Sequence, residues 1–202
     1  NSLRLLNLDD GVQDYVREMN LAAVRLARKV ADEFTSLTPD KPRFVAGSVG
    51  PTNKTCSMSP DVNNPAFRAL SYDELADAYR EQMEALLEGG VDALLIETIF
   101  DTLNAKAAIF AAGQAMETVG VHVPLMLSVT VSDIGGRTLS GQTLDAFLAS
   151  VQHADIFSVG LNCSFGARQL KPFLEQLAAR APYYISAYPN AGLPNSLGTY
   201  DQ

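Results

Sequence analysis

Five short apolar segments that alternate with helical patterns constrain this chain more than any other feature of its sequence. The segments are residues 43–49, 92–97, 125–131, 156–162 and 183–188. Their polarity mostly does not alternate, which is typical of strands covered on both faces of a parallel sheet. After a longer first interval the segments begin about thirty residues apart, the period of βα units joined by right-handed crossovers. The sequence therefore predicts an α/β fold with five parallel strands.

Helical patterns fill the intervals between these segments. Apolar residues recur at spacings of three and four over residues 15–34 and again over 75–87. Ser71 and Glu74 have the spacing of a capping box before the second of these helices, and Gly89-Gly90 is expected to end it. Further helices are expected from Asp101 or Thr102 to about Thr118, over residues 143–153 and over residues 167–179.

Two architectures are compatible with five parallel strands. One is an open doubly wound sheet, and the other is five of the eight strands of a (β/α)8 barrel, a fold that typically needs about 250 residues. The strand pattern favours the open sheet, because that fold is complete with five strands. The phosphate-binding glycine motifs of nucleotide-binding sheets are, however, absent from the sequence. No linker or low-complexity tract divides the chain, so a single domain over residues 1–202 is predicted.

Charge and composition exclude some classes of partner. The chain has 15 Lys and Arg against 23 Asp and Glu, a net charge of −8, which argues against binding to nucleic acid or to an anionic membrane. No apolar run reaches the ~18 residues of a membrane span. Two cysteines favour a reducing compartment, and a cytoplasmic location is predicted. The chain starts without methionine, which suits a piece of a larger protein.

Cys163 is the main candidate for chemistry. It ends the run Gly160-Leu161-Asn162-Cys163 at the carboxyl end of a predicted strand, where α/β folds place their sites. A free thiol there could be a metal ligand or simply a small buried apolar group. A catalytic zinc usually takes three protein ligands, and the only other cysteine is Cys56.

The remaining candidates leave alternatives open. Cys56, His122 and His153 lack ligand spacing, so Cys56 is expected to be incidental and both histidines to be solvated. Glu97 closes an apolar run, and a carboxylate at a buried strand end must be paired or hydrogen-bonded. It could bind the backbone amides of the next helix, or it could hold a substrate ammonium group.

Three stretches make the resemblance to a known family specific. They are Gly50-Pro51-Thr52-Asn53 with residues 59–63, the run from Ile96 to Lys106, and Gly160-Leu161-Asn162-Cys163 with residues 188–195. Together they resemble the homocysteine-binding domain of cobalamin-dependent methionine synthase. The Gly-x-Asn-Cys element is shared with other homocysteine S-methyltransferases, such as those that use betaine or S-methylmethionine.

This resemblance implies a partial (β/α)8 TIM barrel whose five strands are about the third to the seventh. It implies that Cys163 is the first of three zinc cysteines, the other two being an adjacent pair that this sequence lacks. It further implies that Glu97 contacts the amino group of homocysteine and that Asn162 lies at the substrate site.

The partners and chemistry are likewise implied by the resemblance. Zinc would activate the homocysteine thiol, which would take a methyl group from methylcobalamin to give methionine. The cobalamin and folate domains would belong to the same parent polypeptide. With one of three zinc ligands, this chain is expected to be inactive alone. The alternatives are a betaine- or S-methylmethionine-dependent methyltransferase and a non-catalytic binding fragment.

Overall fold

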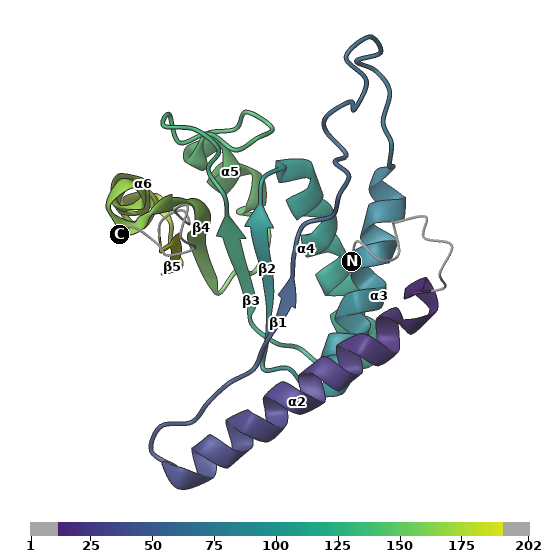
Figure 1. Ribbon diagram of the computed structural model, residues 1–202, viewed down its shortest axis with the longest axis vertical. Helices are drawn as coiled ribbons and strands as arrows, with labels where there is room; N and C mark the ends of the chain where they lie inside the picture. The colour runs from purple at the N-terminus through teal and green to yellow at the C-terminus, as the bar shows by residue number, and fades with distance from the viewer. Residues whose placement is uncertain (1–11, 192–202) are drawn as a thin grey trace, which may run out of the picture.

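The computed structural model describes residues 12–191 and has the predicted alternation of helices and strands (Figure 1). A short 3-10 helix, Val12–Tyr15, leads directly into the first long helix. In chain order the remaining elements are α2 (Val16–Leu37), β1 (Ala46–Val49), α3 (Tyr72–Gly89), β2 (Ala93–Ile99), α4 (Thr102–Val119), β3 (Leu125–Val129), α5 (Leu144–Val151), β4 (Ser158–Gly166), α6 (Ala167–Arg180) and β5 (Tyr184–Asn190).

The order of the strands decides between the two architectures. All five strands are parallel and lie in the order β1-β2-β3-β4-β5, so each strand pairs with the next one in the sequence. An open doubly wound sheet reverses its strand order at a switch point, whereas a barrel keeps advancing in one direction. The sheet is therefore a partial TIM barrel, and the open sheet that the strand pattern favoured is excluded.

The helix ends follow the local chemistry of the sequence. Ser71 and Glu74 form the expected capping box at the start of α3, and Gly90 ends that helix in the left-handed conformation. Asp101 rather than Thr102 caps α4, because its carboxylate accepts hydrogen bonds from the backbone amides of the first turn. These caps satisfy groups that a helix terminus leaves unpaired.

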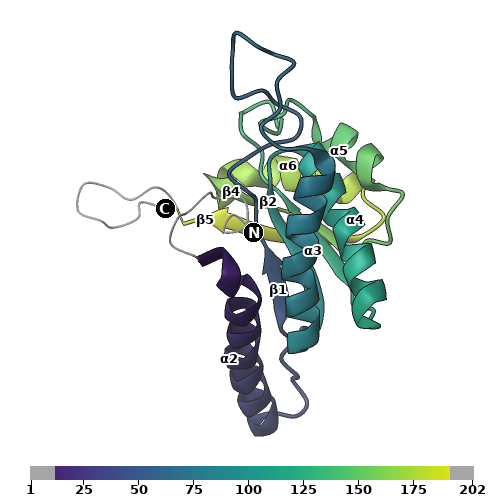
Figure 2. The ribbon, with the colours of Figure 1, turned by 90° about the vertical axis from the view of Figure 1, so that its right-hand side faces the viewer.

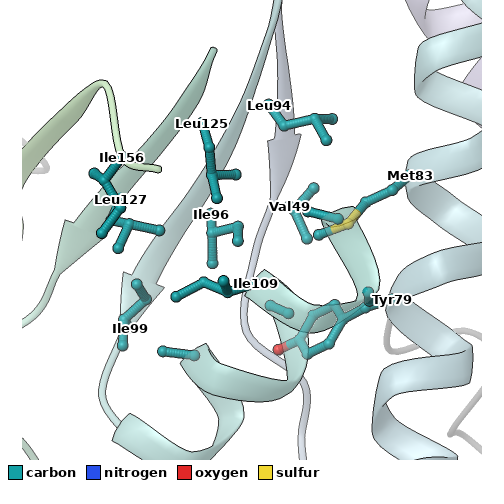
Figure 3. Close-up of a cluster of buried hydrophobic side chains, with 14 of the residues drawn as sticks. Val49, Tyr79, Met83, Leu94, Ile96, Ile99, Ile109, Leu125, Leu127 and Ile156 are labelled. Carbon is teal, nitrogen blue, oxygen red and sulfur yellow. The ribbon is translucent and has the colours of Figure 1, made fainter. Parts of the chain in front are cut away.

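The core lies between the sheet and the helices that cover one face of it, where α3 and α4 pack side by side and α5 and α6 also contribute buried residues (Figures 1 and 2). Alternate residues of the strands point toward these helices and are fully buried, among them Val49, Leu94, Ile96 and Leu127 (Figure 3). The opposite face is less covered among the described residues, and β1 alternates strictly between exposed and buried positions. The expectation that both faces are covered therefore fails at β1 and β5, whereas β3 and the first half of β4 are buried on both faces.

Helix α2 packs differently from its sequence pattern. Val24 and Ala31 are buried, and Val24 lies where a side chain on Gly89 of α3 would clash with it. Arg28 pairs with Asp92, whose carboxylate also accepts a hydrogen bond from the Val45 amide. The apolar residues that mark the helix in the sequence are half exposed or more, namely Tyr15, Met19, Leu26, Val30 and Phe34. Helix α2 packs on α3 through the side that carries Val24, because Gly89 of α3 has no side chain and allows a close approach there.

Gly160 allows β4 and β5 to approach closely, just before the candidate site. A Cβ atom at Gly160 would lie 2.1 Å from the hydroxyl oxygen and 2.3 Å from the carbonyl oxygen of Ser186. We expect Gly160→Ala to lower the free energy of unfolding by about 1–3 kcal/mol, because backbone must move. Urea denaturation measures this change. Gly113→Ala in α4 is the matched control, since nothing lies within 4 Å of its Cβ position; an equal loss in both variants would contradict the prediction.

Candidate metal and substrate site

The candidate site lies toward the carboxyl ends of β2, β3 and β4. Ser128 of β3 is in register with Gly160, two residues before Asn162 on β4, and all three residues lie on the same face of the sheet. Thr98 on β2 is hydrogen-bonded to Asn162 through both its backbone amide and its hydroxyl group. The fold thus brings Thr98, Ser128, Asn162 and Cys163 together, and Glu97 lies next to Thr98 on β2.

Asn162 is the centre of this cluster, and its side chain is saturated with hydrogen bonds. It is 5% exposed. Its Oδ1 atom accepts from the Thr98 amide at 3.2 Å and from the Ser128 hydroxyl at 2.7 Å. Its Nδ2 atom donates to Thr98 Oγ1 at 3.0 Å and to Cys163 Sγ at 3.1 Å. One carboxamide therefore links three strands to the thiol.

The backbone is strained on both sides of this carboxamide. Thr98, Cys163 and Ser164 have positive φ angles of 58°, 59° and 59°, which is uncommon for residues other than glycine and exceptional for a β-branched one. The register of β2 with β3 shifts between Ile96 and Ile99, and that of β4 with β5 shifts after Asn162. Such strain persists only where surrounding contacts hold it, and it concentrates at functional sites.

Glu97 lies beside this turn on β2 and is half-buried. Its carboxylate accepts a hydrogen bond from the hydroxyl group of Ser48, which lies on β1. The backbone amides at the start of α4 bond to Asp101 instead, at 2.8 and 3.3 Å. Helix capping, one of the two roles open to Glu97, is thus performed by Asp101.

Comparison with known proteins identifies the family to which this site belongs. A family model described as Homocysteine S-methyltransferase matches residues 2–202.

The chain belongs to the homocysteine S-methyltransferase family.

Solved structures of the homocysteine methyltransferase MmuM from Escherichia coli have the same fold. The apo form is 23% identical with a TM-score of 0.70, and the match covers 93% of this chain and 64% of that one. The metallated form is also 23% identical, with a TM-score of 0.69, and the match covers 87% of this chain and 59% of that one. The chain therefore spans less than two thirds of the length of these family members.

Cys163 is the sequence candidate in this cluster whose chemistry suits a metal ion. Cys163 is a half-buried free thiol whose sulfur already accepts one N–H hydrogen bond, and thiolate sulfur is a preferred zinc ligand. Within residues 12–191 no three His, Cys, Asp or Glu side chains cluster closely enough to hold a metal ion. The described residues therefore do not form a complete metal site by themselves.

The other sequence candidates, Cys56, His122 and His153, are not part of this cluster. Cys56 is buried, and its amide donates to the Asn104 side chain at 2.9 Å. Burial, reinforced by the nearby Asp101, raises the pKa of the Cys56 thiol to about 11, so this cysteine is protonated at neutral pH. His122 and His153 are exposed, as expected of solvated histidines.

A cavity of about 1120 Å³ lies at the opposite, amino-terminal ends of the strands. Its lining includes His122, Leu125, Phe157 and Tyr184 but none of the residues that surround Cys163. It is therefore separate from the candidate site.

Sequence reasoning missed Thr98, Ser128 and Ser48 at this site. A signal for Ser128 is present, because it is the only polar residue in the apolar strand Leu125–Val129. Thr98 carries no such signal, since its role depends on a backbone conformation and on a partner 64 residues away.

None of the helices within residues 12–191 combines the length and apolar character that a membrane span requires.

Proposed function

We propose that this chain is the homocysteine-binding part of a methyltransferase of the cobalamin-dependent methionine synthase type. The observation that carries the proposal is that Glu97 and Cys163 lie on two strands, β2 and β4, that Thr98 and Asn162 join by hydrogen bonds at this level of the sheet. A carboxylate and a thiol placed in this way suit a substrate that carries an ammonium group at one end and a sulfur atom at the other.

Glu97 would bind the ammonium group of homocysteine. Its carboxylate is half-buried, and the Ser48 hydroxyl group orients it from the neighbouring strand. An ion pair in a partly desolvated site is stronger than one in water, because less solvent screens the charges. Binding there would fix one end of the substrate and direct its sulfur toward the carboxyl end of β4.

Cys163 would supply one thiolate ligand to zinc, with the remaining cysteine ligands contributed by a part of the protein outside this sequence. When bound, zinc lowers the pKa of a coordinated thiol, so that the homocysteine sulfur is a nucleophile at neutral pH. The Asn162 amide would hold the Cys163 sulfur in place through its hydrogen bond at 3.1 Å. Because residues 12–191 provide a single thiol ligand, we expect the isolated chain to bind zinc weakly and to lack activity.

The motifs from Ile96 to Lys106 and from Tyr188 onward favour methylcobalamin as the methyl donor, delivered by cobalamin and folate domains of the same polypeptide. Only residues 188–191 of the second motif lie within the described residues. The alternative is direct transfer from betaine or S-methylmethionine. It has support in the Gly-x-Asn-Cys element, which those enzymes share. A third possibility is a binding fragment without catalytic activity.

The methyl donor can be tested with the complete protein that contains this chain. Zinc-loaded protein is given homocysteine and one of three donors, methylcobalamin, betaine or S-methylmethionine, and methionine is measured by mass spectrometry. We expect methionine with methylcobalamin alone. Product from either of the other donors would favour the alternative branch. No product from any donor, in protein with stoichiometric zinc, would contradict both enzymatic proposals.

A further inference from the structure

We infer that Thr98 and Ser128 are positioning residues for the sulfur atom of Cys163. They hold the carboxamide of Asn162 in one orientation, so that its N–H group points at that sulfur. The inference rests on the proposed function, in which Cys163 binds zinc, and it assigns roles to two residues that do not themselves contact the metal.

The orientation of the carboxamide follows from its hydrogen bonds. The Thr98 backbone N–H lies 3.2 Å from Oδ1 of Asn162, and a backbone N–H can only donate. The oxygen of the carboxamide must therefore face Thr98 N, and the Ser128 hydroxyl donates to the same oxygen at 2.7 Å. The amide nitrogen then faces the opposite side, where Thr98 Oγ1 and Cys163 Sγ accept its two hydrogens at 3.0 and 3.1 Å.

Burial makes this orientation costly to change. Asn162 and Ser128 are 5% and 6% exposed, so water cannot easily replace a lost partner. Rotating the carboxamide by half a turn would place its NH₂ group against the Thr98 N–H and its oxygen against the sulfur. Buried donors and acceptors without partners strongly destabilise a folded structure. The Asn162 side chain is therefore a fixed donor to Cys163.

The same hydrogen bonds span the two strained turns of the site. Thr98 and Cys163 both have positive φ angles, and each lies where a strand pairing loses its register. Thr98 contacts the carboxamide through its amide and its hydroxyl group, so β2 and β4 are locked at this level of the sheet. Because Thr98 directly follows Glu97, this lock also fixes the proposed ammonium-binding carboxylate relative to the sulfur.

An N–H donor of this kind has a defined effect on a metal-bound thiolate. It orients the sulfur lone pairs and draws charge from the sulfur, and such outer contacts typically change metal affinity by about 10- to 100-fold when they are removed. Thr98 and Ser128 do not contact the sulfur; they act on it through the Asn162 carboxamide that they orient.

The test compares Thr98→Val with Thr98→Ser in the complete protein that contains this chain. Valine keeps the branched shape and removes the hydroxyl group, whereas serine keeps the hydroxyl group. Zinc affinity is measured by competition with a chelator, and the sulfur-to-cobalt absorption band is recorded after loading with Co²⁺. We expect Thr98→Val to weaken zinc binding by several-fold, up to about 10-fold, and to shift the band, and Thr98→Ser to keep both at the parent values.

Ser158→Ala is the matched control for the removal of a buried hydroxyl group. Ser158 lies on β4, the strand that carries Asn162, and is 3% exposed, and its hydroxyl has no hydrogen-bond partner among residues 12–191. We expect this variant to bind zinc as the parent does. Should Thr98→Val fail to fold, as judged by circular dichroism, Ser128→Ala replaces it, since Ser128 lies outside the strained turns.

The outcomes separate this inference from the proposed function. The positioning role is overturned if Thr98→Val leaves both the zinc affinity and the absorption band unchanged, even when Cys163→Ala loses the metal. The same holds for Ser128→Ala where that variant replaces Thr98→Val. Retention of zinc by Cys163→Ala would instead overturn the metal assignment itself, and the inference with it. Equal weakening in Thr98→Val and Ser158→Ala would also count against the inference, because general loosening of the fold would then explain both.

Discussion

Replacing Cys163 with alanine is expected to abolish methyl transfer by the complete protein and to reduce its bound zinc to a small fraction of the stoichiometric amount. A three-thiolate site that loses one ligand keeps neither its geometry nor its affinity, and without the metal the homocysteine thiol is mostly protonated at neutral pH. Zinc content is measured by elemental analysis, and methionine formation is measured on the same sample.

Cys56→Ala is the control for this prediction. Cys56 is buried beside Asn104 and Asp101, with a thiol that is protonated at neutral pH. We expect Cys56→Ala to keep its zinc and its activity, with at most a modest loss of stability from the smaller side chain. Full activity and normal zinc content in Cys163→Ala would reject Cys163 as a ligand.

Replacing Glu97 with glutamine is expected to weaken homocysteine binding while leaving zinc in place. Loss of a desolvated partner of an ammonium group costs about 2–5 kcal/mol, which corresponds to roughly 30-fold to several thousand-fold in affinity. Homocysteine binding is measured by calorimetry on zinc-loaded protein, alongside the metal content.

Glu117→Gln is the matched control for the loss of one negative charge. Glu117 lines the cavity at the opposite end of the strands, so its replacement removes the same charge without touching the site. We expect its homocysteine affinity to equal that of the parent. Unchanged affinity in Glu97→Gln would leave Glu97 with a structural role only, through its hydrogen bond with Ser48.

Much of the secondary structure could be predicted from the sequence, because local interactions decide it. The five apolar segments became five strands with ends shifted by a few residues, and β4 continues to Gly166, beyond the predicted end at residue 162. The capping box at Ser71 and the end of α3 at Gly89-Gly90 occur as predicted, since both depend on residues only a few positions apart.

The strand order could not be read from the residues alone. Five buried parallel strands satisfy the same apolar pattern in an open sheet and in a barrel, and the pattern favoured the open sheet. Resemblance to a family pointed to the barrel, and the sequential pairing of β1 to β5 decided the question.

Sequence alone placed Glu97, Asn162 and Cys163 toward the carboxyl ends of strands, because an apolar run followed by a polar residue marks that region, although β2 and β4 continue past them to Ile99 and Gly166. Only the tertiary structure decided that Thr98, Ser128 and Cys163 meet around the buried carboxamide of Asn162. The contacts of Ser128 and Thr98 join residues 34 and 64 positions apart and require two turns with positive φ angles. No local pattern encodes such a turn at a threonine or a cysteine, because its conformation is unfavourable in isolation and is maintained by hydrogen bonds that form only when the three strands are assembled.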